Sequence, residues 1–215
     1  VETVEIVDIT IDVPPECAVC AVVQITLDRP APVTVLLGKE GESLGPWVQS
    51  VAVTESHTLT LLELHANTAY RVQASIPDQE VDPNHEHMFT TGTLPEGIPD
   101  ITLRTGGDIR QQPGLTLMNV VEWANPDGRR FFILAVDEAG QVVWYHQLDR
   151  LALALAIDEQ RRIYTTDSLL QAVRIDPYAQ SKTVWSVEDL GISSVHHDFR
   201  PTPDGQMALI STEME

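Results

Sequence analysis

Two adjacent histidines followed by an aspartate are the residues of this chain best suited to chemistry. They form the run Val195-His196-His197-Asp198-Phe199. A neutral imidazole is a nucleophile and proton shuttle near neutral pH, and a neighbouring carboxylate can fix its tautomer. Adjacent residues of a strand point to opposite faces, so we expect only one of the two histidines to face a given site. By itself the run is more often structural or surface-exposed, and it names no reaction.

The other candidates for a site are weaker. Asp82, His85 and His87 cluster before the last strand of the N-terminal region, and their spacing permits a surface metal ion. No further strong ligand is fixed nearby, so we expect neither a metal nor a cofactor. His146 follows two aromatic residues and is expected to be an edge residue at a strand end.

Only two cysteines occur, Cys17 and Cys20. One such pair cannot complete a four-ligand zinc site, and no thioredoxin-like βαβ pattern surrounds it. The sequence does not decide between two states of this pair, a local disulfide at a strand entrance and two buried thiols. The sequence also has no phosphate-binding glycine loop and no Gly-x-Ser-x-Gly motif.

The charge balance excludes some partners. Asp and Glu number 32 against 13 Lys and Arg, which gives a formal net charge of −19. Such a surface repels phosphate backbones and anionic headgroups, so neither nucleic acid nor a membrane surface is an expected partner. No apolar run approaches the ~20 residues of a membrane helix. The acidity is explained by solubility and indicates no function.

The elements that must position these residues are strands. Residues 1–94 have no helical stripe and predict an immunoglobulin-like sandwich of seven short strands. The segment from Leu64 to Val72, "DRPAPVTVLL" and "FTTGTLP" resemble the fibronectin type III pattern. The resemblance implies that Tyr70 is a tyrosine-corner residue, its hydroxyl bonded back to the preceding turn. The predicted strands are Val4–Val13, Ala18–Leu27, Val33–Leu37, Trp47–Thr54, Ser56–Leu61, Tyr70–Ile76 and His87–Thr93.

A linker at 95–99, with two prolines and a glycine, precedes a repeated pattern. "FFILAVDEAGQVVWYHQ" parallels "AVRIDPYAQSKTVWSVE", and "LALAIDEQRRIYTTD" parallels "FRPTPDGQMALIST". A period near 40–45 residues with four short strands predicts propeller blades. Residues 100–215 then make two to three blades, whereas closure takes about four. We expect the chain to be a fragment, in preference to a ring completed by partner chains or a second copy.

Three finer expectations concern this repeat region. Leu148–Ile157 contains strong helix formers, but its apolar residues alternate, so we predict a strand. Asp204-Gly205 predicts a two-residue hairpin loop. Trp123, Trp144 and Trp185 are expected to fill gaps between blades.

Taken together, the fibronectin-like region, "DEAGQVVWY" and "HHDFRPTPDGQMALI" resemble the bacterial arylsulfotransferase family. The resemblance implies a six-bladed propeller, located in the periplasm or outside the cell after removal of a leader. Such enzymes move a sulfuryl group from a phenolic sulfate ester to a phenol through a sulfated histidine. By this resemblance His197 is the first channel histidine, His196 the second, and Arg200 a weaker candidate for binding the sulfuryl oxygens.

The resemblance is incomplete. The family's nucleophilic histidine and central arginine come from later blades, and no residue here matches them. We therefore expect the chain alone to be inactive. The rival hypothesis is a non-catalytic secreted or cell-surface propeller used for adhesion, scaffolding or assembly, since fold does not decide function.

Overall fold

The computed structural model describes residues 3–82, 85–102, 113–122, 128–178 and 181–212. Over these residues the chain is built of antiparallel strands with one short helix, so the predicted all-β class is confirmed. The chain divides into two compact units. One unit comprises residues 1–95 with 142–144, and the other comprises residues 96–141 with 145–215.

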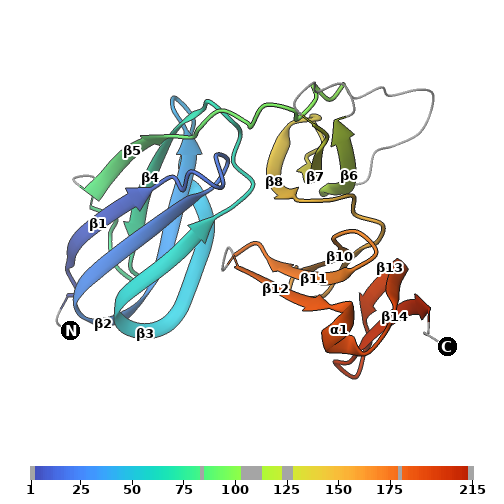
Figure 1. Cartoon of the computed structure of the whole chain (residues 1–215). Coiled ribbons are helices and arrows are strands. Elements are labelled where there is room, and N and C mark those ends of the chain that lie inside the picture. The colour runs from blue at the N-terminus through green and yellow to red at the C-terminus, as the bar shows by residue number, and fades with distance from the viewer. Residues whose placement is uncertain (1–2, 83–84, 103–112, 123–127, 179–180, 213–215) are drawn as a thin grey trace. The chain divides into compact units, whose positions relative to one another are not determined.

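The first unit is a curled five-stranded sheet (Figure 1). The start of β2 pairs with β1 and with the end of β3, whereas the end of β2 pairs with β4 and with the start of β3. β5 pairs with β4. The strands of this sheet are β1 (Ile6–Asp12), β2 (Ala21–Lys39), β3 (Gly45–Leu61), β4 (Ala69–Ser75) and β5 (Glu86–Thr90).

The prediction of seven separate strands is wrong for this unit, because the described sheet has five strands. Ala18–Leu27 and Val33–Leu37 merge into β2, and Trp47–Thr54 and Ser56–Leu61 merge into β3. The register between β2 and β3 shifts between Thr26 and Val33, around Pro30. A proline cannot donate a ladder hydrogen bond, but it is tolerated at a bulge, so the two strands bend there without ending.

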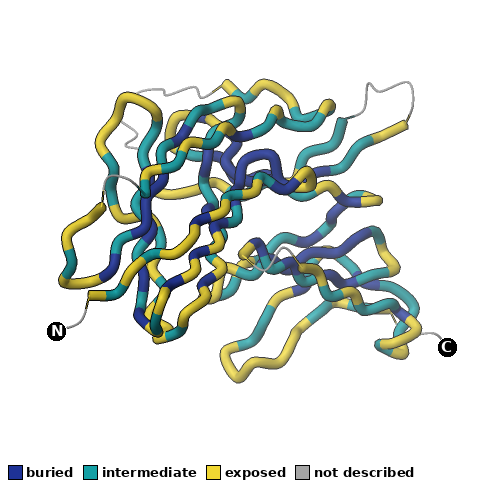
Figure 2. The backbone as a smooth tube through the Cα atoms, turned by 90° about the vertical axis from the view of Figure 1, so that its left-hand side faces the viewer, coloured by how far each residue is buried: buried dark blue, intermediate teal, exposed yellow. Residues whose placement is uncertain are grey.

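Alternation along these strands builds the core of the first unit. In β2 the odd-numbered residues from Ala21 to Leu37 are buried, with Arg29 as the exception, and they pack with Ile9, Leu61 and Val72. Figure 2 shows buried and exposed positions alternating along the strands. Inward-facing apolar residues at a period of two are the pattern of a half-buried sheet.

Tyr70 closes the turn that precedes β4. Its side chain is buried and its ring stacks on Phe89 with centroids 5.6 Å apart. The backbone N–H of His65 donates to the Tyr70 hydroxyl at 2.9 Å. The predicted bond from this hydroxyl to the preceding turn is therefore present.

Cys17 and Cys20 form a disulfide, which decides between the two states left open by the sequence. Both residues are buried in the turn before β2. The N–H of Gly92 donates to the carbonyl of Ala18 at 2.8 Å, and a Cβ on Gly92 would lie 3.0 Å from that of Ala18. The small residue at position 92 thus lets the chain close over the disulfide turn.

Over its described residues, the second unit contains three separate sheets. The first is three-stranded, and the second is a four-stranded meander in chain order. The third is the hairpin of β13 (Ser194–Pro201) and β14 (Met207–Thr212). The remaining strands are β6 (Thr116–Glu122), β7 (Arg130–Val136), β8 (Val142–Leu148), β9 (Leu155–Ile157), β10 (Ile163–Thr166), β11 (Gln171–Asp176) and β12 (Ser181–Ser186).

Helix α1 (Val187–Leu190) connects β12 to β13. Ser186 caps it, because its hydroxyl accepts from the Asp189 N–H and the Asp189 carboxylate accepts from the Ser186 N–H. Gly191, in the left-handed region with φ 67°, ends the helix. This capping box and glycine C-cap are sufficient to define one helical turn.

Three hairpin turns of this unit have the same construction. In 137–141, 158–162 and 202–206 the first residue's N–H donates to the fifth residue's carbonyl at 3.0, 3.1 and 2.8 Å. The fourth residue has positive φ: 81° at Gly140, 61° at Arg161 and 81° at Gly205. The two-residue loop predicted at Asp204-Gly205 is therefore wrong: the loop has three residues, because only Gly205 takes the left-handed conformation.

The strand predicted over Leu148–Ile157 is also only partly present. β8 ends at Leu148, and β9 contains only the last three residues. Between them the threonines of β10 bind the backbone: the Leu153 N–H donates to Thr166 Oγ1, and Thr165 Oγ1 donates to the Ala154 carbonyl. Side-chain hydroxyls thus replace the strand partner that a ladder would need.

Candidate functional site

The His196-His197-Asp198 run lies in a bulge of β13. His196 pairs with Ile210 and Phe199 pairs with Leu209, so His197 and Asp198 have no opposite residues on β14. His197 adopts φ 25°, in the left-handed region that non-glycine residues rarely occupy. The rings of His196 and His197 lie 29° from parallel with centroids 6.1 Å apart. The expectation that the histidines point to opposite faces is wrong, because the bulge interrupts the alternation.

The two imidazoles differ in their surroundings. His196 is half-buried, and its Nε2 shares a hydrogen bond of 2.9 Å with the Ser194 hydroxyl, which also contacts Thr212. His197 is exposed. The hydroxyl contacts hold the His196 ring in place, whereas the His197 ring is presented to an approaching molecule.

Asp198 pairs with Arg200 rather than serving a histidine in any contact that the structure describes. The Arg200 Nε and Nη2 donate to the two Asp198 carboxylate oxygens at 2.9 and 2.7 Å. This pairing raises the pKa of the Arg200 guanidinium. Arg200 is therefore a positive group three residues beyond His197 on the same strand, with much of its charge directed at Asp198.

Two anchors fix the ends of the bulge. Before it, the Val195 N–H donates to the carbonyl of Leu169 at 2.8 Å. After it, Phe199 is 1% exposed. Its ring makes edge-to-face contacts with the rings of Tyr164 and Trp185, with centroids 5.6 and 6.1 Å apart. The bulged residues are thus held between a hydrogen bond and a buried aromatic cluster. Trp185 of β12 thus packs against Phe199 of the neighbouring sheet.

The remaining sequence candidates fall outside this group. Trp144 is buried, and Trp123 lies outside the described residues. His146 lies near the end of β8, the edge strand of its sheet, as predicted, and is half-buried. Burial, then the nearby Lys182, lowers its pKa to about 4.

Sequence reasoning missed Asp167, in the turn after β10. Its side chain is buried, and its carboxylate accepts the backbone N–H of Arg150, while Oδ1 has no partner among the described residues. Burial, followed by the nearby Asp149, raises the pKa of this carboxyl group. No spacing in the sequence distinguishes it from an ordinary turn aspartate.

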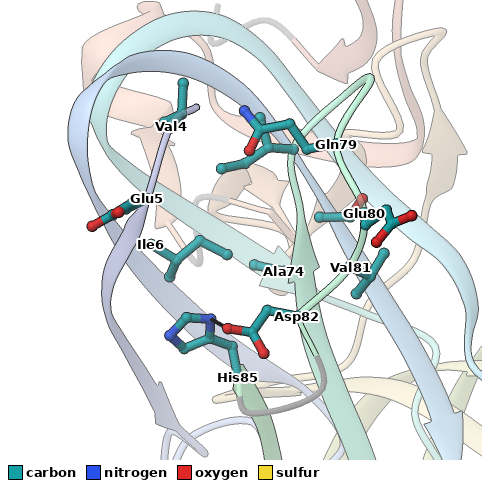
Figure 3. Close-up of a pocket in the computed structure, with 11 residues that line it drawn as sticks. Val4, Glu5, Ile6, Ala74, Gln79, Glu80, Val81, Asp82 and His85 are labelled. Atoms are coloured by element: carbon teal, nitrogen blue, oxygen red, sulfur yellow. Dashed lines mark ion pairs between the residues drawn. The ribbon is translucent and has the colours of Figure 1, made fainter. Parts of the chain in front are cut away.

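Asp82 and His85 line a cavity in the first unit (Figure 3). The His85 Nδ1 and an Asp82 carboxylate oxygen are 3.5 Å apart. His87, opposite Val72 on β4, does not line the cavity. Over the residues that the structure describes, no three His, Cys, Asp or Glu side chains gather in a way that could hold a metal ion.

Comparison with known proteins adds no family assignment. Neither the protein-family models nor the curated proteins give a match to this chain. Within the described ranges, no helix has the length and apolar character needed to cross a membrane. The site must therefore be interpreted from its own geometry.

Proposed function

We propose that this chain is the N-terminal portion of an arylsulfotransferase-like propeller enzyme. The meander β9–β12 would be one complete blade, and β6–β8 and β13–β14 would belong to the blades on either side. The first unit would be a fibronectin-III-like sandwich. The pairing of each half of β2 with different neighbours supports this, as does the hydroxyl bond of Tyr70.

The observation that carries the functional proposal is the left-handed φ of His197 within an anchored bulge. Such a conformation costs on the order of 1–3 kcal/mol in a non-glycine residue, and it persists only where the surroundings enforce it. Bulges also re-aim side chains beside active sites. The hydrogen bond at Val195 and the buried ring of Phe199 supply that enforcement, and the strain places two imidazoles side by side.

The chemistry proposed for the site is proton transfer during sulfuryl transfer. When the sulfur–oxygen bond of an aryl sulfate breaks, the leaving phenolate takes a proton from the His197 imidazolium. The neutral imidazole then takes a proton from the acceptor phenol, whose oxygen bonds to sulfur and displaces the histidine that held the sulfuryl group. That histidine would come from another part of the propeller. His196 and Arg200 would stabilise the sulfuryl oxygens. A protein of this kind would work in the periplasm or outside the cell.

Single asparagine substitutions test this proposal in the protein that contains this chain. We expect His197→Asn to lower transfer from 4-nitrophenyl sulfate to phenol by at least about a hundredfold, since loss of an acid–base group costs ~10²–10⁴-fold. His196→Asn should have a smaller effect. His87→Asn, on β5 of the other unit, is the matched control and should leave the rate unchanged. A dead His196→Asn with an active His197→Asn would reverse the two roles.

The alternative function is a non-catalytic scaffold or adhesion propeller. It is favoured by the Asp198–Arg200 pair, which draws positive charge away from an anionic substrate, and by the net charge of −19. If the wild-type protein transfers no sulfate to any phenol, the enzyme proposal fails and the scaffold function stands.

A further inference from the structure

A cavity of about 370 Å³ lies in the first unit, between the start of β1 and the connector from β4 to β5. This volume is at the small end of the range for ligand pockets. Figure 3 shows Ile6 and Ala74 near its centre, with Gln79 at one end and the Asp82–His85 pair at the other. Val4, Ile76 and Val81 complete the apolar part of the lining. The cavity thus has an apolar middle and polar ends.

Hydrogen bonds fix the connector that forms one wall. The Gln79 amide, with its nitrogen oriented toward the Val4 carbonyl, donates to that oxygen at 3.1 Å and accepts from the Val4 N–H at 3.1 Å. The Gln73 side chain donates to the Asp82 backbone carbonyl at 2.6 Å. The wall is therefore held from the segment just before β1 and from β4, and a ligand would find it already in place.

With the His85 imidazole neutral, every charged side chain of the described lining is negative. Glu5, Glu80 and Asp82 line the cavity, and no lysine or arginine is among the lining residues that the structure describes. The Asp82 and His85 side chains remain partly exposed, at 47% and 35%, so a ligand group can reach them. A positive group at this end would be attracted by the Asp82 carboxylate, whereas an anion would be repelled.

We propose that this cavity binds a small organic monocation, with its ammonium group beside Asp82 and its hydrocarbon body over Ile6 and Ala74. A metal ion fits less well, because the described carboxylates and histidines do not converge as metal ligands there and the middle of the cavity is apolar. The site is independent of sulfuryl transfer, since its charge excludes sulfate esters.

The test is an NMR titration of the whole 215-residue chain with 2-phenylethylamine as the probe. We expect saturable shifts at the amides of Ala74, Val81 and His85, with a Kd on the order of 1 mM for so small a ligand. The neutral 2-phenylethanol should bind at least about fivefold more weakly, because it lacks one charge–charge attraction. The anion 3-phenylpropionate should cause no saturable shift at these amides.

A charge-matched pair of variants separates local recognition from the overall negative field. Asp82→Asn should weaken 2-phenylethylamine binding about fivefold or more, whereas Asp8→Asn, an exposed change on β1 outside the cavity, should not. If Asp82→Asn does not fold, Glu80→Gln replaces it as the test variant in the same titration. Equal binding of amine and alcohol, equal effects of the two variants, or no binding of the amine would each overturn the proposal.

Discussion

Acidification should destabilise the second unit through His146. Its pKa is lowered from 6.5 to about 4 in the folded protein, first by burial and then by Lys182. Between these two values the unfolded chain binds a proton that the folded chain excludes. The free energy of unfolding therefore rises with pH across this window, and this part of the stability is lost as pH falls from about 6.5 to about 4.

The size of the effect follows from the same two pKa values. At 1.36 kcal/mol per pH unit, the full lowering corresponds to about 3 kcal/mol. The His146 side chain is only partly buried, so solvent screening reduces this, and we expect about 2 kcal/mol. The neighbouring Asp149 acts in the opposite direction and favours the protonated ring.

The measurement is urea unfolding at pH 7, 6, 5 and 4, followed by tryptophan fluorescence, with Trp185 reporting on the second unit. Wild type should lose about 2 kcal/mol more than His146→Asn between pH 7 and pH 4. The control is His197→Asn, which replaces an exposed imidazole of the same unit by a residue that tolerates positive φ. If wild type and His146→Asn lose stability in parallel, the reasoning is refuted.

Three further changes test other parts of the structure. Asp167→Asn should stabilise the second unit at pH 7 by about 1 kcal/mol, because it removes a carboxylate charge that burial and the nearby Asp149 disfavour. Because the folded pKa of Asp167 is raised, this gain should vanish below about pH 3.8, and a gain that persists there would contradict the assignment. Tyr70→Phe should cost the first unit about 1 kcal/mol in thermal unfolding, since the His65 N–H loses its acceptor. Replacing Cys17 and Cys20 with serine should cost about 2 kcal/mol, because the loop that they close is short, and should leave turnover unchanged. A large loss of turnover at unchanged stability would show a redox role instead.

Local patterns predicted much of this fold. Alternating apolar residues located most strands, and the residues before Tyr70 located its hydroxyl bond, because both depend on neighbours in the sequence. The merging of four predicted strands into β2 and β3 depends on something else. Whether a chain that reaches Pro30 turns away or continues beyond a bulge is decided by the strand beside it, here β3. The surroundings of Asp167 are likewise supplied by a segment outside its own turn: Asp149 and Arg150 lie near its carboxylate, and the Ser168 N–H donates to the Leu151 carbonyl.

The bulge of β13 shows most clearly why the candidate site was only partly predictable. A period of two places His196 and His197 on opposite faces, and nothing in the run itself contradicts that. The structure departs from it because Phe199 is bound into an aromatic cluster and Val195 is bound to Leu169. With both ends of the bulge held, the consecutive β14 residues Leu209 and Ile210 pair with Phe199 and His196. Residues 197 and 198 of β13 therefore have no partner on β14 and leave the ladder. The positive φ of His197 is thus imposed by packing on a neighbouring sheet. A substitution that loosens Phe199 should therefore disturb the imidazole pair as directly as a change to either histidine.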